Sequence, residues 1–538
     1  MLEAKYLSRM DFRGYKDFKD NMKPVVPGRF SFAVDIVDEW AAREPDKRAL
    51  VYVTDESDVR TFTFAEMSLL SKKAAQYLLD LGIQKGDRVI LLLRRRWEYW
   101  VAAVALNRIG ATVIPASVML TEKDISYRVQ ASRARLVIAL DDPFVTEQTS
   151  HLKDKCPTLI DVIQSGGDDC TFNLGMMQAE PYEGKPVIEN DEEMIIYFTS
   201  GTTGMPKMAV HNRTYPIGHI ITAKYMQKVQ NNGLHLTQAD SGWAKFGWGN
   251  IYGQWICGSA ILGYDPIRFQ SENLMKIMEK CKPTSLCIPP TMYRFLLRDG
   301  LERRHIQSIQ WFSTAGEPLS PEVNREFETI SGHPIHEAFG QSEGTPITCT
   351  FEWLRVKPGS MGKPSPLYDV RLVDKEGKSV EPGDNGEVCI FTQPDETPVG
   401  LMCGYDVDGV LQRNYDTIYH TGDIAYEDEE GYYWYVSRTD DMIKCSGYRI
   451  GPFEIESVIN THPAVRESAV IGRPDEIRGQ VVCAVIVLQA GVEPSDELSA
   501  EIKQYVKTNT APYKYPRIIE YLPELPKTTS GKIIRNVL

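Results

Sequence analysis

Buried strands alternate with amphipathic helices from the N-terminus to about Tyr368, and this alternation limits the possible folds more than any other feature of the chain. Residues Phe64 to Leu81 have the apolar spacing of a helix that stops at Gly82, and the DRVILLL segment after them is typical of a buried strand. The stretch YWVAAVALNRIGATVIPA then predicts a helix, a glycine stop and another strand. Repeated strand–helix–strand units of this kind predict an α/β region with a mostly parallel sheet.

The pattern changes to short strands and turns after about Tyr368. The segments VRLVD, KEGKSVEPGDNGE and VCIF predict a small antiparallel barrel or sheet. After Tyr435, a helix at Pro452 to Asn460, strands at VRESAVIG and VVCAVIVL, and a helix at Ser495 to Thr508 predict an α+β module. The C-terminal part therefore differs in fold class from the α/β region before it.

The composition limits the kinds of partner that the protein can bind. The 538 residues are enough for two or more domains, and 42% hydrophobic with 25% charged residues is typical of a soluble globular protein. Sixty Lys and Arg against 73 Asp and Glu give a net charge of −13, which argues against a general nucleic-acid or anionic-membrane surface. No apolar run approaches the roughly 20 residues of a membrane span. Any anionic ligand must therefore meet locally placed cations.

The cysteines and the first residues bear on the compartment. The ten cysteines include neither a Cys-x-x-Cys pair nor a Cys/His cluster, so the sequence indicates neither a zinc site nor a disulfide framework and favours a reducing compartment. The start, MLEAKYLSRMDFRGYKDF, contains Glu3, Asp11 and Asp17 and lacks an apolar signal core. We therefore predict a cytoplasmic protein.

The stretch MIIYFTSGTTGMPK, from Met194 to Lys207, joins an apolar strand to a loop of hydroxyls and glycines. Exposed backbone N–H groups, four hydroxyls and a lysine suit a polyphosphate. The P-loop of kinases and GTPases is excluded, because Lys207 follows Pro206 and only two residues separate Gly201 from Gly204. A surface turn is the alternative for glycine-rich loops in general, but the lysine and the hydroxyls favour a phosphate site here.

Two further clusters follow apolar segments of the α/β region. STAGEP (Ser313 to Pro318) would bring a backbone close to a flat ligand, although a simple turn has the same composition. HEAFGQSEG (His336 to Gly344) offers an aromatic ring, a hydroxyl and a carboxylate at Phe339, Ser342 and Glu343. Beside a triphosphate, this set would stack a base, bind a phosphate and hold Mg²⁺, and a solvated strand end is the alternative.

Two clusters lie nearer the C-terminus. In HTGDIAYEDEEGYYWYVSR, Asp423 is expected to end a short strand, a turn reverses the chain, and Arg438 lies on the returning strand. The two side chains would then reach the two sides of one sugar. PKTTSGKIIR (Pro526 to Arg535) places Lys532 in a glycine-bounded turn, where a lone lysine is usually only solvated.

Five segments together resemble, in their order and spacing, the motifs of the acyl-adenylate-forming superfamily of acyl-CoA synthetases, adenylation domains and luciferases: TSGTTGMPK, STAGEP, FGQSEG, TGD with SRTDDMIKCSGYRIGPFEIE, and PKTTSGKIIR. The resemblance extends from about Phe30 onward, and both ends look most like medium-chain acyl-CoA synthetases. It implies a large α/β N-terminal domain (residues 1–439) with two βα sheet subdomains and a small β-barrel. A smaller, mobile α+β domain (residues 440–538) would follow.

The resemblance implies a ligase that forms an acyl-AMP from an acid and ATP and then transfers the acyl group to CoA, with Mg²⁺ as the metal. Because a carboxylate must attack a phosphate, such an enzyme supplies cations and geometry rather than a protein nucleophile. The implied nucleotide contacts are Thr199, Ser200, Gly201, Thr202, Thr203, Gly204 and Lys207 at the phosphates, Gly316, Glu317, Pro318 and Phe339 around the adenine, Gly340 and Gln341 in the same nucleotide-binding motif, Ser342 at the α-phosphate, and Asp423 and Arg438 at the ribose. Glu343, with Thr202, would hold Mg²⁺.

Lys532 is implied to bridge the attacking carboxylate and the α-phosphate, where a positive charge is worth ~3 to 4 kcal/mol in the transition state. For the thioester step, the C-terminal domain would rotate about a hinge at Asp440, withdraw Lys532 and bring Lys444 toward the site. A solvated acidic turn is the alternative for Asp440. The residues then facing the pantetheine of CoA would be Ser446, Gly447 and Tyr448.

The acid pocket is expected beside Gly340, since family members that use acetate carry a tryptophan there. Glycine leaves room for a short- to medium-chain acid, straight or branched. The aromatic segment Trp243 to Gly258 is the expected second wall, with Trp248 as a gate for ATP or as core filler. Lys245 beside an apolar pocket would attract a carboxylate or have a lowered pKa.

Two other functions stay open at this point. An aryl- or amino-acid-adenylating enzyme that loads a carrier protein would need an acidic residue for the amino group, and Asp240 has no supporting pattern. A non-catalytic acyl-nucleotide sensor would not need Lys532, Glu343, Asp423 and Arg438. The expected partners are a small carboxylic acid, ATP and CoA, without nucleic acid, and the chain is expected to be a monomer or homodimer.

Overall fold

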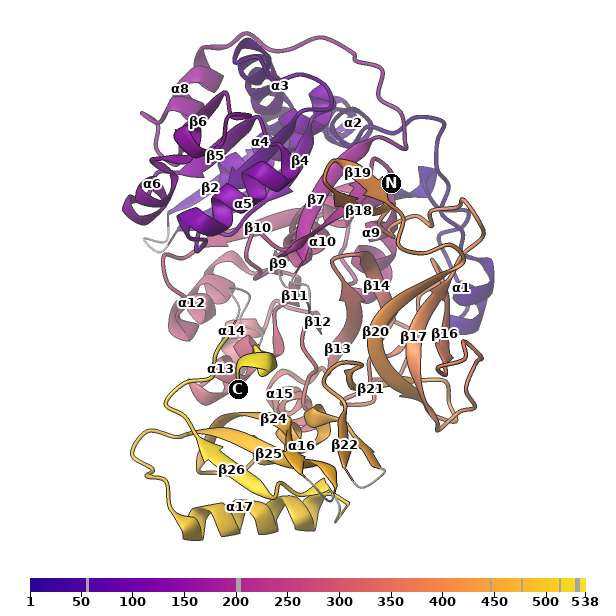
Figure 1. The fold of residues 1–538 in the computed structure, drawn as a ribbon. Helices are drawn as coiled ribbons and strands as arrows, with labels where there is room; N and C mark the ends of the chain where they lie inside the picture. Colours follow the sequence, from indigo (N-terminus) through magenta and orange to yellow (C-terminus); the bar gives the residue numbers. More distant parts are fainter. Residues whose placement is uncertain (55–57, 200–204, 446–447, 476–477, 512–513, 528–532) are drawn as a thin grey trace. The chain divides into compact units, whose positions relative to one another are not determined.

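The computed structural model describes residues 1–54, 58–199, 205–445, 448–475, 478–511, 514–527 and 533–538 (Figure 1). The chain divides into two compact units. The first unit comprises residues 1–370 and 391–419, and the second comprises residues 371–390 and 420–538.

One mixed sheet of the first unit has the order β19-β18-β8-β7-β4-β3-β5-β6. The pairs of β3 with β4 and β5, of β4 with β7, and of β5 with β6 are parallel, whereas β7, β8, β18 and β19 pair antiparallel. The strands are β3 (Arg88–Leu92), β4 (Thr112–Pro115), β5 (Leu136–Leu140), β6 (Asp161–Ser165), β7 (Glu193–Thr199), β8 (Lys207–Asn212), β18 (Gly404–Val407) and β19 (Val410–Gln412). The strand predicted before the phosphate loop is confirmed as β7.

The helices predicted around this sheet are also confirmed. Helix α3 (Phe64–Asp80) begins at a capping box, in which the Thr63 hydroxyl accepts the Glu66 N–H and the Glu66 carboxylate accepts the Thr63 N–H. Helix α4 (Trp97–Ile109) ends at Gly110, whose φ of +78° is the left-handed cap that glycine adopts at low cost. Every residue of α4 is buried, so its sequence lacks a polar face.

A second mixed sheet of the first unit has the order β15-β14-β13-β12-β11-β9-β10-β1-β2. Its strands are β1 (Arg48–Thr54), β2 (Val59–Thr63), β9 (Leu234–Thr237), β10 (Ala260–Asp265), β11 (Ser285–Cys287), β12 (Trp311–Ala315), β13 (Ile335–Gln341), β14 (Gly344–Cys349) and β15 (Lys363–Pro364). Pairing is parallel from β1 through β13 and antiparallel at both ends. The carboxyl ends of β12 and β13 therefore lie at one edge, where parallel sheets commonly bind ligands.

Short helices connect and cover these sheets (Figure 1). They are α1 (Tyr15–Asn21), α2 (Glu39–Arg43), α5 (Glu122–Ser132), α6 (Pro143–Thr149), α7 (Leu152–Lys155), α8 (Thr171–Gln178), α9 (Tyr215–Ile221), α10 (Ala244–Asn250), α11 (Tyr252–Ile256), α12 (Ser271–Cys281), α13 (Pro290–Arg298), α14 (Arg303–Ile306) and α15 (Pro321–Ser331). The indole N–H groups of the buried Trp100 and Trp255 donate to backbone carbonyls, so these large side chains add apolar area to the core without an unpaired donor.

Most of a sheet in the order β16-β17-β20-β21 belongs to the second unit, which also contains a sheet in the order β23-β22-β25-β24, with β26 beside β25. The strands are β16 (Asp369–Val373), β17 (Asn385–Phe391), β20 (Ile418–Glu427), β21 (Tyr433–Arg438), β22 (Ile443–Cys445), β23 (Tyr448–Ile450), β24 (Val465–Asp475), β25 (Gly479–Leu488) and β26 (Ile518–Tyr521). Helices α16 (Pro452–Ile459) and α17 (Asp496–Asn509) complete the predicted α+β module.

The predicted fold class is confirmed: a large α/β part, a small antiparallel sheet and a small α+β part. The region predicted as a barrel or sheet has the strand order of a sheet within the described residues. The domain boundary between residues 439 and 440 stays a prediction.

Candidate active site

The two ends of the phosphate loop lie opposite each other. Strands β7 and β8 are antiparallel neighbours in which Thr199 pairs with Lys207. Thr199 is buried at the end of β7 and Lys207 is exposed at the start of β8. Ser200, Gly201, Thr202, Thr203 and Gly204 lie outside the described residues. Strand pairing thus holds the lysine and the first hydroxyl at the same end of one sheet.

Glu343 belongs to a polar cluster that includes this lysine. The Tyr405 hydroxyl on β18 donates to Glu343 Oε1 at 2.9 Å, and Lys207 Nζ lies 5.3 Å from the centre of the Tyr405 ring. Tyr405 lies beside β8 in the sheet, where it pairs with Ala209. A carboxylate oxygen is a ligand that Mg²⁺ prefers, so the cluster fits a metal-bound polyphosphate. Sequence reasoning missed Tyr405, since the GYDV segment has no phosphate-binding pattern.

Ser342 and Glu343 form the tip of a hairpin. Strands β13 and β14 pair antiparallel with Gln341 opposite Gly344, which leaves the two residues as the loop. Nε2 of His211 on β8 donates to the Ser342 carbonyl at 2.7 Å. Burial lowers the pKa of His211 to about 4, so the ring is a neutral donor near pH 7. His211, a second residue missed by sequence reasoning, ties the hairpin to the strand of the phosphate loop.

The segments expected to line the adenine lie on adjacent strands. Ala315, the last residue of β12, pairs in parallel with Ala338 on β13, so Gly316 directly after β12 lies beside Phe339 on β13. Gly316 has a φ of +97°, a turn conformation that favours glycine. Phe339 is half-buried at the end of β13.

Other groups fix the ends of this segment. Glu317 Oε2 accepts the Thr291 hydroxyl at 2.8 Å, and Pro318 follows it with partial exposure. Glu337 on β13 accepts the N–H of Leu319, directly after Pro318, and burial raises the pKa of Glu337 to about 8. Gln341 Oε1 accepts the Tyr419 hydroxyl at 2.9 Å. The segment is therefore held by side chains as well as by the sheet.

Gly340 has a structural reason to be glycine. The β13–β14 pairing shifts register between Phe339 and Gln341, so the extra residues of the irregularity lie on β14, opposite Gly340. A Cβ on Gly340 would lie 3.0 Å from Cα of Pro346, closer than side chains normally approach a backbone. Any larger residue must move β14 slightly, apart from any effect on a pocket.

Lys245 and Trp248 lie on α10. Lys245 Nζ donates to the Ala315 carbonyl at 2.8 Å, directly before Gly316. Burial lowers the pKa of Lys245, and the neighbouring Cys287 and Glu317 oppose that shift. Trp248 is buried in the apolar core of the first unit. Lys245, which the sequence analysis assigned to the acid pocket, thus contacts the end of β12, directly before the segment expected to line the adenine.

Asp423 and Arg438 are direct partners in the second unit. They pair in the β20–β21 register, and Arg438 Nη1 lies 3.0 Å from Asp423 Oδ2 and donates to the Thr421 carbonyl at 2.9 Å. The expectation that Asp423 ends a short strand was wrong, because β20 continues to Glu427. The strand is longer since the reversing turn begins only at Asp428.

The predicted hinge and the C-terminal motif are partly described. Asp440 is exposed in the turn between β21 and β22, and Lys444 on β22 is exposed with its N–H bonded to Gln480. Tyr448 begins β23, whereas Ser446, Gly447 and Lys532 lie outside the described residues. Shortly after Lys532, Arg535 pairs with Glu456 at 2.7 Å and with Asp441 at 3.4 Å. The C-terminal segment is thus anchored beside the predicted hinge.

The described helices include none with the length and apolar character needed to cross a membrane.

Comparison with known proteins assigns the chain to an enzyme family. Residues 37–405 match the AMP-binding enzymes, and residues 454–532 match the C-terminal domain of AMP-binding enzymes. The chain is 37% identical over 544 residues to the mitochondrial acyl-coenzyme A synthetase ACSM3 of Mus musculus, covering 98% of this chain and 93% of that protein. It is 38% identical over 530 residues to the mitochondrial acyl-coenzyme A synthetase ACSM4 of Homo sapiens, covering 95% and 90%.

A solved structure of a CoA ligase has a similar fold. The anthranilate CoA ligase AuaEII in complex with anthranoyl-AMP superimposes with a TM-score of 0.84 at 26% identity, covering 95% of this chain and 97% of that chain. The chain therefore belongs to the AMP-binding enzymes and, within them, to the acyl-coenzyme A synthetases. The family and the AMP-forming acid–thiol ligase activity inferred from the five motifs are confirmed.

Proposed function

We propose that this acyl-CoA synthetase acts on a short- to medium-chain carboxylic acid, straight or branched. The acid and ATP give acyl-AMP and diphosphate, and the CoA thiol then displaces AMP to give acyl-CoA. The cluster of Lys207, Tyr405 and Glu343 carries the ATP-dependent part of the proposal, because it offers a cation and a metal-binding carboxylate where a polyphosphate would lie.

We assign the phosphate contacts to the loop from Thr199 to Lys207 and the α-phosphate contact to Ser342. Glu343, together with Thr202, would hold Mg²⁺, which neutralises charge on the phosphates. Gly316 to Pro318 and Phe339 would line the adenine, and Gly340 and Gln341 would also contact the nucleotide. The adjacency of β12 and β13 supports that assignment, because the flat ring fits against exposed backbone beside an aromatic side chain.

In the second unit, Asp423 and Arg438 would contact the ribose hydroxyls. Lys532 would neutralise charge between acid and α-phosphate during adenylation. Rotation of residues 440–538 about Asp440 would then bring Lys444 toward the site for the thioester step. The residues assigned to the pantetheine of CoA are Ser446, Gly447 and Tyr448.

The acid pocket would lie near Gly340, Lys245 and Trp248. The contact of Lys245 with the Ala315 carbonyl supports a position close to the reacting groups. A lysine held there would draw the anionic carboxylate end of the acid, whereas the buried aromatic side chains of α10 and α11 would contact its chain.

The compartment and the assembly remain proposals. The sequence favours the cytoplasm, whereas the relatives named above are mitochondrial proteins by name. All ten cysteines are free, which fits either reducing compartment. Fractionation of cells that express the chain with its own N-terminus separates the two, and light scattering separates a monomer from a homodimer.

A screen of acids tests the proposal. Diphosphate release is measured with acetate, butyrate, hexanoate, octanoate, isobutyrate, benzoate and amino acids, each with and without CoA. We expect turnover and acyl-CoA with butyrate to octanoate only when CoA is present. Diphosphate exchange with amino or aryl acids without CoA thioesters would instead indicate loading of a carrier protein. Nucleotide binding without diphosphate release would indicate a sensor.

A further inference from the structure

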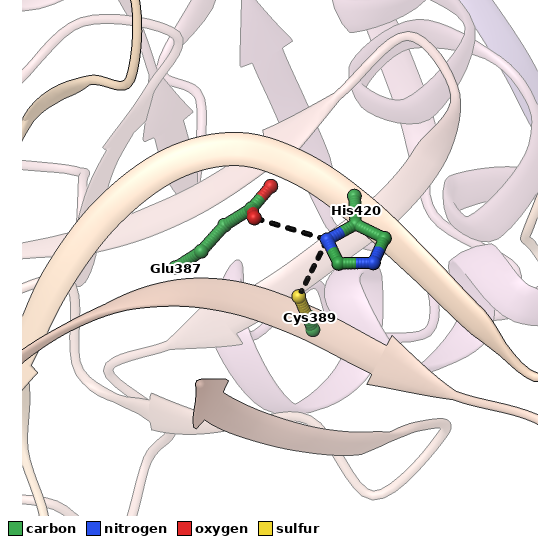
Figure 2. Close-up of side chains that lie close together, drawn as sticks. All are labelled: Glu387, Cys389 and His420. Carbon is green, nitrogen blue, oxygen red and sulfur yellow. Dashed lines mark hydrogen bonds and ion pairs between the residues drawn. The ribbon is translucent and has the colours of Figure 1, made fainter. Parts of the chain in front are cut away.

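Three side chains that commonly bind metals meet on a sheet of the second unit (Figure 2). Glu387 and Cys389 are two residues apart on β17, so they project from the same face, and His420 lies on β20 beside them. His420 Nδ1 lies 3.0 Å from Glu387 Oε2 and 3.4 Å from Cys389 Sγ. The ligand atoms all lie within 4.8 Å of one another.

The spacing suits a tetrahedral ion. Ligand atoms bound at about 2.0 to 2.3 Å to one tetrahedral zinc ion lie roughly 3.3 to 3.7 Å apart, close to the two shorter separations here. A thiol, an imidazole and a carboxylate are also the ligand types that zinc takes, whereas magnesium and calcium prefer oxygen alone. Both contacts of His420 Nδ1 have hydrogen-bond geometry, but this nitrogen carries at most one hydrogen, whereas one metal ion would account for the two close ligands together.

We propose that Glu387, Cys389 and His420 bind one Zn²⁺ ion, with water as the fourth ligand. On binding, the S–H bond of Cys389 breaks, a Zn–S bond forms and the proton passes to solvent, without oxidation or reduction. His420 would give its Nδ1 lone pair and keep its proton on Nε2. His420 is exposed and Cys389 is fully buried, so the ion enters from the histidine side.

One ligand of the site, His420, lies on β20, the strand that also carries Asp423. Glu387 Oε1 accepts the Gly422 N–H at 2.9 Å, whereas Oε2 faces the histidine. The Thr421 hydroxyl donates to the Val388 carbonyl at 2.7 Å. An ion bound through Oε2 leaves both bonds in place and replaces the Glu387–His420 and Cys389–His420 hydrogen bonds with metal bonds between β17 and β20. It would therefore stabilise this strand pair without displacing a group proposed to contact the nucleotide.

Metal titration of the full-length chain tests the site. Protein freed of metal with a chelator is titrated with Zn²⁺ by calorimetry, and with Co²⁺ while the absorption spectrum is recorded. We expect one high-affinity ion per chain and a thiolate-to-cobalt charge-transfer band. Cys389→Ser and His420→Ala should each weaken Zn²⁺ binding by at least about tenfold and remove or shift that band, since losing even an outer ligand partner costs that much.

Two matched variants control for generic thiols and histidines. Cys483 contacts the Glu520 carboxylate at 3.5 Å, and His151 lies exposed 3.9 Å from Asp154, but neither belongs to a three-ligand group found among the described residues. Cys483→Ser and His151→Ala should leave the binding unchanged. Equal affinity in wild type, Cys389→Ser and His420→Ala, or no stoichiometric binding to wild type, would overturn the proposal. If Cys389→Ser fails to fold, the Zn²⁺ affinity of His420→Ala still tests the site, because an exposed side chain can be truncated with little effect on folding.

Discussion

Glu343 and Asp423, the acidic residues proposed to handle ATP in the first and second unit, lie in different surroundings. Glu343 is half-buried, and the partner of its Oε1 is the uncharged Tyr405 hydroxyl. Asp423 is only 4% exposed and pairs with the Arg438 guanidinium at 3.0 Å. A carboxylate with a neutral partner keeps its negative charge available to a metal ion. A buried carboxylate balanced by arginine suits neutral hydroxyls instead.

The difference implies two kinds of contribution. The first unit would hold the metal and the phosphates, where charge is present throughout the reaction. The second unit would orient the sugar and add positive charge only while the acid attacks. Changes in the two units should therefore alter different measured quantities.

The largest effect is expected from the second unit. Lys532→Ala removes the cation proposed to act in the adenylation transition state, which is worth ~3 to 4 kcal/mol, or about 10²- to 10³-fold in kcat. Adenylation, measured as acid-dependent ATP–diphosphate exchange, should fall by this amount. Formation of acyl-CoA from preformed acyl-AMP should stay close to the wild-type rate.

Asp440→Pro is the reciprocal control. Proline fixes φ and should block the proposed rotation, so the thioester step should fall while ATP–diphosphate exchange continues. Equal losses of both half-reactions in Lys532→Ala would contradict its assignment. Normal thioester formation in Asp440→Pro would remove Asp440 as the pivot.

The next effect concerns acid stability of the first unit. Burial lowers the pKa of His211 and His336 to about 4 and that of His235 to about 3. Burial also lowers the pKa of His219. Below pH 6.5 the unfolded chain binds protons that these folded residues do not. The free energy of unfolding that depends on these neutral histidines is therefore fully present above pH 6.5 and is lost as the pH falls through about 4 to 3. The His211 shift alone corresponds to about 3 kcal/mol.

Urea unfolding at a series of pH values measures this loss. His211→Gln is the matched variant, since a glutamine amide can also donate to the Ser342 carbonyl but does not titrate. Its free energy of unfolding should decline by about 3 kcal/mol less than that of the wild type between pH 6.5 and 4. Parallel curves for the two proteins would show that His211 titrates normally.

The sequence predicts elements whose signals are local. Helix α3 could be located because its apolar spacing and the stop at Gly82 are close together in the chain, and α4 because Gly110 marks its end. The glycine-rich loop and the FGQSEG segment could be assigned because each motif is continuous. Signals that are continuous in the sequence therefore suffice to predict the fold class and most of the candidate nucleotide site.

Contacts made by strand pairing could not be predicted in this way. Tyr405 is 62 residues from Glu343, and His211 is 131 residues from Ser342. Each pair meets only because distant strands lie side by side. The same holds for Cys389 and His420, 31 residues apart on neighbouring strands, which a search for short Cys and His spacings could not find.

Replacing the carboxylates of Glu343 and Asp423 with amides tests directly whether the two residues have different roles. Glu343→Gln should raise the Mg²⁺ concentration needed for half-maximal adenylation, with partial rescue by added Mg²⁺. Asp423→Asn should raise KM for ATP by about 10- to 100-fold, since hydrogen bonds to charged groups are worth ~1.5 to 3 kcal/mol. Added Mg²⁺ should not rescue Asp423→Asn. Metal rescue of both variants would mean that the two carboxylates share one role.

A further effect concerns the acid. Gly340→Trp should shift preference toward acetate or propionate, because excluding roughly three methylenes at ~0.8 kcal/mol each raises discrimination against hexanoate by about one to two orders of magnitude. The measurement is kcat/KM for acetate, butyrate and hexanoate. Because any Cβ at this position approaches Pro346 at 3.0 Å, Gly340→Ala is the control for backbone movement. If alanine and tryptophan give the same change in ranking, the pocket does not end at Gly340.

The smallest expected effect tests why Glu343 has a neutral partner. Tyr405→Phe removes the 2.9 Å hydrogen bond to Glu343 Oε1 but keeps the ring beside Lys207. One hydrogen bond of this kind contributes ~0.5 to 1.5 kcal/mol, so kcat/KM for ATP should fall by no more than about tenfold. The Mg²⁺ dependence should shift in the same direction as in Glu343→Gln, because the hydroxyl orients the proposed metal ligand rather than neutralising it. A loss as large as that of Glu343→Gln would mean that Tyr405 itself contacts the nucleotide, and the contrast with the charge-balanced Asp423 would no longer hold.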